Sequence, residues 1–217
     1  MSGEQEQDRQ EGLRLAVLLS GSGRSLENLL NVIERGELDA EIVAVVSSKS
    51  DARGLDIARQ ASIPSSTFVR RDFASDDEFS TAVLGWVEPF RPHLLIFAGY
   101  LRKLIVPPRW DRRILNIHPA LLPESGFGGR GFYGQRVHAA VLASGATISG
   151  ATVHIVDNEY DHGPVVMRAE VPVLPDDTPE SLSARVFAAE VALFPKAIRA
   201  YVNEHRWLIA DTPAETR

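Results

Sequence analysis

LRLAVLLSGSGRSLENLL, residues 13–30, decides the fold. The apolar run Leu13–Leu19 is closed by Ser-Gly-Ser-Gly, which predicts a buried strand that enters a tight turn. Apolar residues then recur at helical spacing until Gly36, namely Leu26, Leu29, Leu30 and Ile33. The stretch is therefore predicted to be a strand, a turn and a helix.

The same alternation of strand and helix patterns continues as far as residue 118. Further strands are predicted at 42–46, 66–69, 94–98 and 113–118, and further helices at 51–61 and 76–88. Alternation of this kind indicates a parallel sheet with helices on both faces. Ligands of such sheets bind at the carboxyl ends of the strands, where three segments should meet: Ser20–Ser25, Gly99–Lys103 and Asn116–Pro123.

The C-terminal part has a different pattern. Residues 126–134 (GFGGRGFYG) hold five glycines and predict a flexible loop, followed by a short helix at 137–142. Strands at 149–156 and 164–171 are expected to pair antiparallel, and an amphipathic helix covers 179–204 with a possible break at Pro195. We therefore expect a single-domain α/β fold. It has an open twisted sheet with a parallel, Rossmann-like N-terminal half, antiparallel strands near the C-terminal part and a long C-terminal helix.

Composition narrows the functional classes. The chain has 217 residues, 44% of them apolar, so residues 13–210 suffice for one domain between a disordered tail at 1–12 and a short tail at 211–217. The net charge of −6 argues against nonspecific nucleic-acid binding, and the absence of cysteine excludes disulfides and cysteine-based zinc sites. We expect a cytoplasmic protein, since neither a signal peptide nor a membrane span is evident.

The motif Asn116-Ile117-His118-Pro119 carries the clearest chemical signal. Asn116 and His118 lie two residues apart, so both side chains should point to the same face of a strand. An imidazole moves protons near neutral pH, and an amide can donate to an oxyanion. Asp161, in a sharply shaped Asp-x-Gly-Pro loop, can support the basicity of the histidine. This set suits acyl transfer to an amine without a protein nucleophile.

Other candidates give weaker signals. A lone histidine is more often structural; we interpret His154 as a supporting polar group and His138 as the start of a helix. The turn at Ser20–Ser25 could bind an anion through backbone N–H groups, and Arg24 suits a monophosphate. The turn lacks the spacing of nucleoside-triphosphate and dinucleotide loops, and a simple tight turn with Ser25 near the cap remains an alternative.

Taken together, these residues resemble the phosphoribosylglycinamide formyltransferases, a folate-dependent formyltransferase family of purine biosynthesis. The resemblance runs from about Leu15 to Pro195. Its motifs are Ser-Gly-x-Gly at 20–23, VVSSK at 45–49, AGYLR at 98–102, LNIHPALLP at 115–123, GATVH at 150–154 and DHGP at 161–164.

The resemblance implies that the amine of glycinamide ribonucleotide attacks the formyl carbon of the cosubstrate 10-formyltetrahydrofolate. Asn116 would bind the formyl oxygen as it becomes negative. Protonated His118 would help to stabilise that oxygen and deliver a proton to the folate nitrogen. Asp161 would raise the pKa of His118 and order a water molecule that relays protons.

Binding residues follow from the same resemblance. Gly23, Arg24 and Ser25 would hold the substrate phosphate, and Glu190 would contact the nucleotide. Folate would bind along Leu101, Arg102, Lys103 and Leu104, beside Asn116, and at the loop of Asp157, Asn158, Glu159, Tyr160 and Asp161. The implied partners are these two small molecules, with no metal, nucleic acid or membrane, in a monomer or homodimer. The 13–210 unit would be the formyltransferase domain.

The sequence departs from the family pattern at several positions. The phosphate turn has Arg24-Ser25 where Ser-Asn is frequent, and Phe187 replaces a polar residue. A folate-binding arginine would fall near Asp76 or Asp77, so that contact is not carried over. The loop after Pro123 is longer and Gly-rich, and resembles another branch of the family except for Arg130 in place of a lysine. The family and proline chemistry also allow a cis Leu122-Pro123 bond.

Four alternatives stay open. A hydrolase that releases formate from 10-formyltetrahydrofolate usually carries an extra N-terminal domain. A sugar-amine formyltransferase usually has further C-terminal structure. A methionyl-tRNA formyltransferase would need a C-terminal domain and a basic surface. A degenerate folate-binding regulator would be a fourth reading, which the intact Asn116, His118 and Asp161 disfavour.

Overall fold

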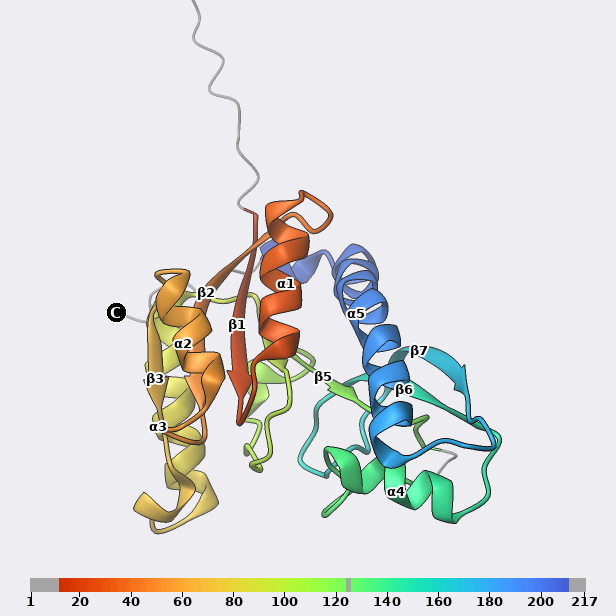
Figure 1. Ribbon diagram of the computed structural model, residues 1–217. Helices are drawn as coiled ribbons and strands as arrows, with labels where there is room; N and C mark the ends of the chain where they lie inside the picture. Colours follow the sequence, from red (N-terminus) through yellow and green to blue (C-terminus); the bar gives the residue numbers. More distant parts are fainter. Residues whose placement is uncertain (1–11, 124–125, 211–217) are drawn as a thin grey trace, which may run out of the picture.

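The computed structural model describes residues 12–123 and 126–210, and these form one seven-stranded sheet covered by helices (Figure 1). The strand order is β3-β2-β1-β4-β5-β6-β7. The predicted tails fall almost entirely outside the described residues, so the tail boundaries stay predictions. No helix in the described part of the chain is both long and apolar enough to cross a membrane.

The N-terminal half of the sheet is parallel, as the alternating pattern predicts. Its strands are β1 (Leu13–Leu19), β2 (Ala40–Ser47), β3 (Ser65–Thr67), β4 (Leu94–Phe97) and β5 (Ile114–His118). The connecting helices are α1 (Arg24–Glu34), α2 (Arg53–Gln60) and α3 (Asp76–Val87), with short 3-10 turns at 70–72, 88–90 and 108–110.

The C-terminal half adds two antiparallel strands and the longest helix. Its elements are α4 (Gln135–Ala143), β6 (Ile148–Ile155), β7 (Val165–Pro172), α5 (Pro179–Glu204) and α6 (Trp207–Ala210). Asn116 of β5 lies opposite His154 of β6 in the register. The expected fold class is therefore confirmed, and α6 is an element that the sequence pattern did not reveal.

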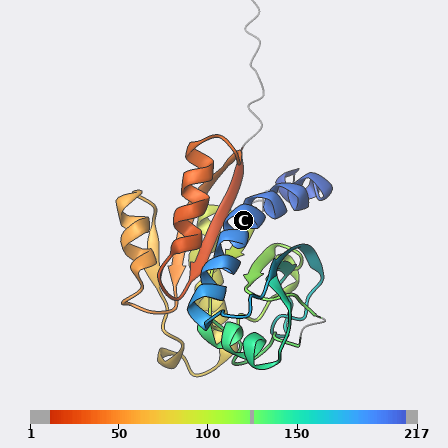
Figure 2. The same cartoon turned by 45° about the vertical axis from the view of Figure 1, so that its right-hand side comes forward.

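Alternating side chains of the strands build two cores, one on each face of the sheet. In β1, Leu15 and Val17 belong to a core that includes residues of α1, α2, α4 and α5, whereas Ala16 and Leu18 belong to a core that includes residues of α3. The burial of both faces explains why the strands are continuous apolar runs. Figures 1 and 2 show α1 and α5 side by side on the first face.

Helix α5 continues through Pro195, so the break expected there does not occur. Proline has no N–H to donate to the carbonyl four residues earlier, which is that of Val191. That carbonyl accepts a hydrogen bond from Asn28 Nδ2 of α1 at 3.0 Å instead. The side chain from a neighbouring helix thus satisfies the group that the proline leaves free, and Pro195 itself is buried in the core.

Candidate active site

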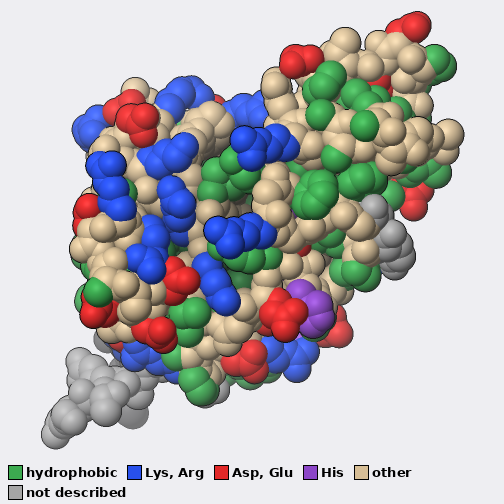
Figure 3. All heavy atoms as spheres, turned by 90° about the horizontal axis from the view of Figure 1, so that it is seen from below, with side chains coloured by type: hydrophobic (Ala, Val, Ile, Leu, Met, Phe, Trp, Pro, Cys, Tyr) green, Lys and Arg blue, Asp and Glu red, His purple; other side chains and the backbone are tan. Residues whose placement is uncertain are grey.

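A cavity of about 960 Å³ opens at the carboxyl ends of the parallel strands, and Figure 3 views the molecule from that side. The three segments predicted to meet there all line it: residues 20–25, 98–103 and 116–119. Residues 129–134 and side chains of α5 complete the wall. The volume is at the upper end of the range for small-molecule sites.

Hydrogen bonds tie the ends of three strands together beneath this cavity. Ser20, after β1, has its Oγ 2.6 Å from Ser48 Oγ, after β2. The backbone N–H of Leu101, after β4, donates to Ser20 Oγ at 2.9 Å. The Ser20 hydroxyl therefore links the predicted phosphate turn to the predicted folate segment.

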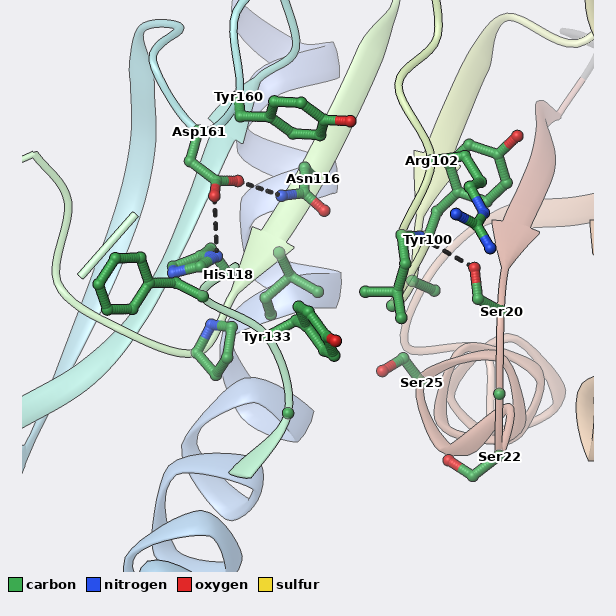
Figure 4. Close-up of a pocket in the computed structure, with 18 of the residues that line it drawn as sticks. Ser20, Ser22, Ser25, Tyr100, Arg102, Asn116, His118, Tyr133, Tyr160 and Asp161 are labelled. Atoms are coloured by element: carbon green, nitrogen blue, oxygen red, sulfur yellow. Dashed lines mark hydrogen bonds and ion pairs between the residues drawn. The ribbon is translucent and has the colours of Figure 1, made fainter. Parts of the chain in front are cut away.

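The predicted catalytic residues lie together at one end of the cavity (Figure 4). Asn116 and His118 project from the same face of β5, and Asp161 reaches them from the loop between β6 and β7. His118 Nδ1 lies 3.5 Å from Asp161 Oδ2, and Asn116 Nδ2 donates to Asp161 Oδ1 at 3.3 Å. The histidine and aspartate side chains are only 5% and 13% exposed, so their interaction is weakly screened.

Local backbone geometry places Asp161. Its φ of 54° lies in the left-handed region, which aspartate tolerates better than most residues. A Cβ at Gly163 would lie 1.9 Å from the carbonyl oxygen of Ile155, so the loop returns to the sheet too closely for any other residue. The Gly163 of the Asp-x-Gly-Pro motif is thus the residue that permits the sharp return.

Three neighbours stabilise the ionised form of Asp161. Burial alone would raise the pKa of this carboxyl group. Positive charge on His154 and His118 when these rings are protonated, together with the Gly129 N–H, which donates to Oδ2 at 2.8 Å, holds the pKa below its ordinary value. Asp161 is therefore a carboxylate at neutral pH.

Two opposing influences set the pKa of His118. Asp161 raises this pKa, as expected, and so does the Phe127 carbonyl. Burial of the ring lowers it by more, so the net shift is downward, which the sequence did not predict. His118 Nε2 lies 2.7 Å from the Phe127 carbonyl oxygen, which can only accept, so Nε2 carries a proton.

His154, which we interpret from sequence as a supporting polar group, lies in direct contact with Asn116. It is 2% exposed, and its Nδ1 lies 2.9 Å from the Ile155 carbonyl, which assigns the proton to Nδ1. Its Nε2 then accepts from Asn116 Nδ2 at 3.0 Å. Both hydrogens of the Asn116 amide are thereby directed to His154 and Asp161, and Oδ1 points away from them (Figure 4).

The other end of the cavity is formed by the turn after β1. Gly23 has φ 73°, and a Cβ there would lie 2.6 Å from Gly54 Cα, so only glycine fits. The glycine leads directly into α1, whose first N–H groups have no partner within the helix. Arg24 begins α1, and its guanidinium carbon lies 3.9 Å from the centre of the Phe187 ring. Gly23, Arg24 and Ser25 all line the cavity.

Glu190 follows Phe187 by one turn of α5 and also lines the cavity. Burial raises the pKa of its carboxyl group to about 7, although the positive charge of Arg24 opposes the shift. Near neutral pH this group is therefore divided between its acid and carboxylate forms.

The predicted folate residues divide into two groups. Leu101, Arg102, Lys103, Tyr160 and Asp161 line the cavity together with Asn116. The other four lie outside its wall, namely Leu104, Asp157, Asn158 and Glu159.

Burial and polar contacts with other segments engage three of those four residues. Leu104 is buried in the core on the α3 side of the sheet. Asn158 Oδ1 accepts from the Val106 N–H at 2.8 Å, and Asp157 Oδ2 lies 3.0 Å from His162 Nδ1. The first contact joins the β6–β7 loop to the segment after β4, and the second lies within that loop, so these residues can shape the cavity only indirectly.

Positive charge gathers around the cavity, although the chain as a whole is acidic. Figure 3 shows lysine and arginine side chains grouped on this face. Sequence reasoning missed Lys49 and Arg70 as wall residues; Arg70 pairs with Asp76. The signal available was the VVSSK motif for Lys49, whereas nothing in the pattern marked Arg70. The lining cations are Arg24, Lys49, Arg70, Arg102, Lys103 and Arg130.

The Gly-rich segment forms part of the wall, as expected for a loop beside the site. His138, at the start of α4, is 2% exposed and also lines the cavity.

The Leu122-Pro123 bond is cis, which the resemblance allowed. Within the described residues no group of three or more histidine, aspartate or glutamate side chains is arranged to hold a metal ion.

Comparison with known proteins extends over the whole sheet. A family model described as "Formyl transferase" matches residues 13–198. The chain is 34% identical over 205 residues to the phosphoribosylglycinamide formyltransferase of Haemophilus influenzae, and the match covers 93% of this chain and 92% of that protein.

A second relative is much longer. The chain is 40% identical over 189 residues to the chicken trifunctional purine biosynthetic protein adenosine-3, which covers 86% of this chain but only 18% of that protein. Among solved structures, glycinamide ribonucleotide transformylase 1 from Symbiobacterium toebii matches with a TM-score of 0.79 and 34% identity. That match covers 87% of this chain and 86% of the other.

Proposed function

The chain belongs to the formyl transferase family, and from that premise we propose that it transfers the formyl group of 10-formyltetrahydrofolate to the amine of 5-phosphoribosylglycinamide in de novo purine biosynthesis. One observation carries the proposal. The Asn116, His118 and Asp161 cluster and the Gly23–Ser25 turn open into the same cavity, so an acyl-transfer centre and an anion site face one another. Products would be the N-formyl nucleotide and tetrahydrofolate.

Direct attack of the substrate amine on the formyl carbon begins the reaction. A carbon–nitrogen bond forms, and the formyl oxygen takes up negative charge in a tetrahedral intermediate. Asn116 stabilises this oxygen through an amide hydrogen. Its bond to Asp161, at 3.3 Å, is longer than its bond to His154, at 3.0 Å, so the first is the one given up to the oxyanion.

His118 carries the proton that must leave the attacking nitrogen. Burial lowers the pKa of its imidazole, which favours the neutral form that can accept a proton. Negative charge on the oxyanion and on Asp161 then stabilises the imidazolium ion. His118 returns the proton to the folate nitrogen as the carbon–nitrogen bond to folate breaks, so one proton moves from the entering to the leaving nitrogen.

The two substrates occupy opposite ends of the cavity. The phosphate lies at the N-terminus of α1, where unpartnered N–H groups and Arg24 favour an anion, and Glu190 contacts the nucleotide. Folate lies along Leu101, Arg102 and Lys103 and beside Tyr160, with its formyl group at Asn116. We also propose a cytoplasmic location and a monomer or homodimer.

A hydrolase that uses water as the formyl acceptor is the main competing function. Arg24 at the far end of the cavity favours the transferase, because water needs no anion site. The test is consumption of 10-formyltetrahydrofolate with and without 5-phosphoribosylglycinamide, with formate and the N-formyl nucleotide both measured. Consumption that depends on the amine and yields the N-formyl product is expected. Formate release at the same rate without amine would overturn the proposal.

A further inference from the structure

Arg24 at the start of α1 and Phe187 of α5 are brought into contact by the fold at one end of the cavity. They are 163 residues apart in sequence, yet the Arg24 guanidinium carbon lies 3.9 Å from the centre of the Phe187 ring. Both residues line the cavity beside the phosphate turn. An arginine at this distance from an aromatic face is held by cation–π attraction.

The contact leaves the hydrogen-bond donors of Arg24 available. A cation–π contact uses the positive charge of the guanidinium group and does not consume its five N–H donors. Among the described residues, no hydrogen bond or ion pair engages the Arg24 side chain. Glu190, one turn beyond Phe187, acts on Arg24 only through its charge. The Arg24 guanidinium group is therefore held in place by the ring, and its N–H donors remain available to a ligand.

A second contact holds the two helices in register. Asn28 lies one turn after Arg24 on α1, and Val191 lies one turn after Phe187 on α5. Asn28 Nδ2 donates to the Val191 carbonyl at 3.0 Å, the group left free by Pro195. Helices α1 and α5 lie side by side at this junction (Figures 1 and 2). The ring of Phe187 faces the Arg24 guanidinium across it.

We infer that Phe187 is a positioning residue that presents the Arg24 guanidinium to the phosphate monoester of the amine substrate. The inference rests on the proposed function and adds to it a device for anchoring the phosphorylated substrate. Arg24 supplies the charge and donors, the first turn of α1 supplies backbone N–H groups, and Phe187 restricts the arginine to the orientation that meets the anion. The expected signature is an effect on substrate binding that disappears when Arg24 is absent.

The test is a double-mutant cycle of Phe187→Leu and Arg24→Ala. For each protein, kcat and KM for 5-phosphoribosylglycinamide are measured at saturating 10-formyltetrahydrofolate, with inhibition by ribose 5-phosphate as a second measure of phosphate binding. Phe187→Leu should raise KM and the inhibition constant roughly fivefold, with kcat little changed. In the Arg24→Ala background the same change should have no further effect.

Two further variants separate positioning from packing. Phe187→Trp keeps an aromatic face and should retain a KM near that of the wild type. Phe90→Leu removes a half-buried ring that packs against Trp86 away from the cavity, and should leave KM unchanged. Thermal melting of every variant checks that the fold is intact.

The outcomes separate this inference from the proposed function. Equal KM increases in the presence and absence of Arg24 would overturn the inference, because Phe187 would then act on the substrate or the fold directly. An unchanged KM in Phe187→Leu would overturn it as well. Absence of amine-dependent turnover in the wild-type protein would instead refute the proposed function.

Discussion

At the catalytic end of the cavity, His118 and Asp161 are largely buried and bonded to neighbouring groups of the protein, whereas at the anchoring end the Arg24 guanidinium is exposed and no hydrogen bond or ion pair in the described part of the chain engages it. The catalytic end comes from β5 and the β6–β7 loop, and the anchoring end from the β1–α1 turn and α5. Preorganised partners suit the stabilisation of charge that develops during the reaction, and free donors suit a charge that arrives with the ligand. Changes at the first end should therefore lower kcat, and changes at the second should raise KM.

The largest effects are expected from His118→Ala and Asp161→Asn. Each removes part of the proton path and should lower kcat by about a hundredfold or more, with little change in KM for the phosphorylated amine. Steady-state kinetics with both substrates varied will show whether the loss of activity lies in kcat or in KM. A loss mainly in KM would contradict the assignment of kcat effects to the catalytic end and KM effects to the anchoring end.

His154→Phe should have the next largest effect. The substitution keeps the ring volume but leaves the Asn116 amide and the Ile155 carbonyl without their partner, so kcat should fall by about ten- to thirtyfold. His162→Ala is the control, since His162 is exposed and bonds only to Asp157 in the described part of the chain. Near-native turnover in His154→Phe would show that Asn116 is oriented by Asp161 alone.

Glu190→Gln should stabilise the protein in a pH-dependent way. The folded state raises the pKa of Glu190 from 4.5 to about 7, so stability contributed by the protonated form is present below pH 4.5 and lost as pH rises through 7. Denaturant unfolding measures the difference in unfolding free energy between the variant and the wild type. This difference should be about 1–2 kcal/mol larger at pH 8 than at pH 5, after allowance for partial exposure of the group. The control is Glu180→Gln at an exposed position, for which the difference in unfolding free energy from the wild type should be the same at both pH values. An equal difference at both pH values for Glu190→Gln would show that the pKa of this carboxyl group is not raised.

Asn28→Ala should give the smallest effect. It removes the hydrogen bond to the Val191 carbonyl and should cost about 1 kcal/mol of unfolding free energy, with a KM increase of only a few-fold. Asn31→Ala, exposed on the same helix, is the matched control. A fall in kcat with unchanged KM would mean that the α1–α5 junction serves the catalytic end instead.

Much of this architecture could be predicted from sequence because its causes are local. Apolar runs and turn residues located the parallel strands, and the spacing of Asn116 and His118 placed both side chains on one face of β5. The Asp-x-Gly-Pro motif indicated a sharp loop, which the close approach of Gly163 to Ile155 explains. The position of Pro195 predicted a lost helical bond but not its replacement by Asn28, which belongs to another helix.

The sequence by itself determined the order of elements and the carboxyl-end location of the site, because these follow from periodicity and turn residues. Its motifs also pointed to the three side chains that we propose for catalysis. Tertiary structure alone decided that burial outweighs Asp161 in setting the pKa of His118, that His154 orients Asn116, and that Phe187 faces Arg24. Desolvation and contacts between distant segments depend on the surroundings of a group in three dimensions. The residues that are adjacent in sequence do not predict those surroundings.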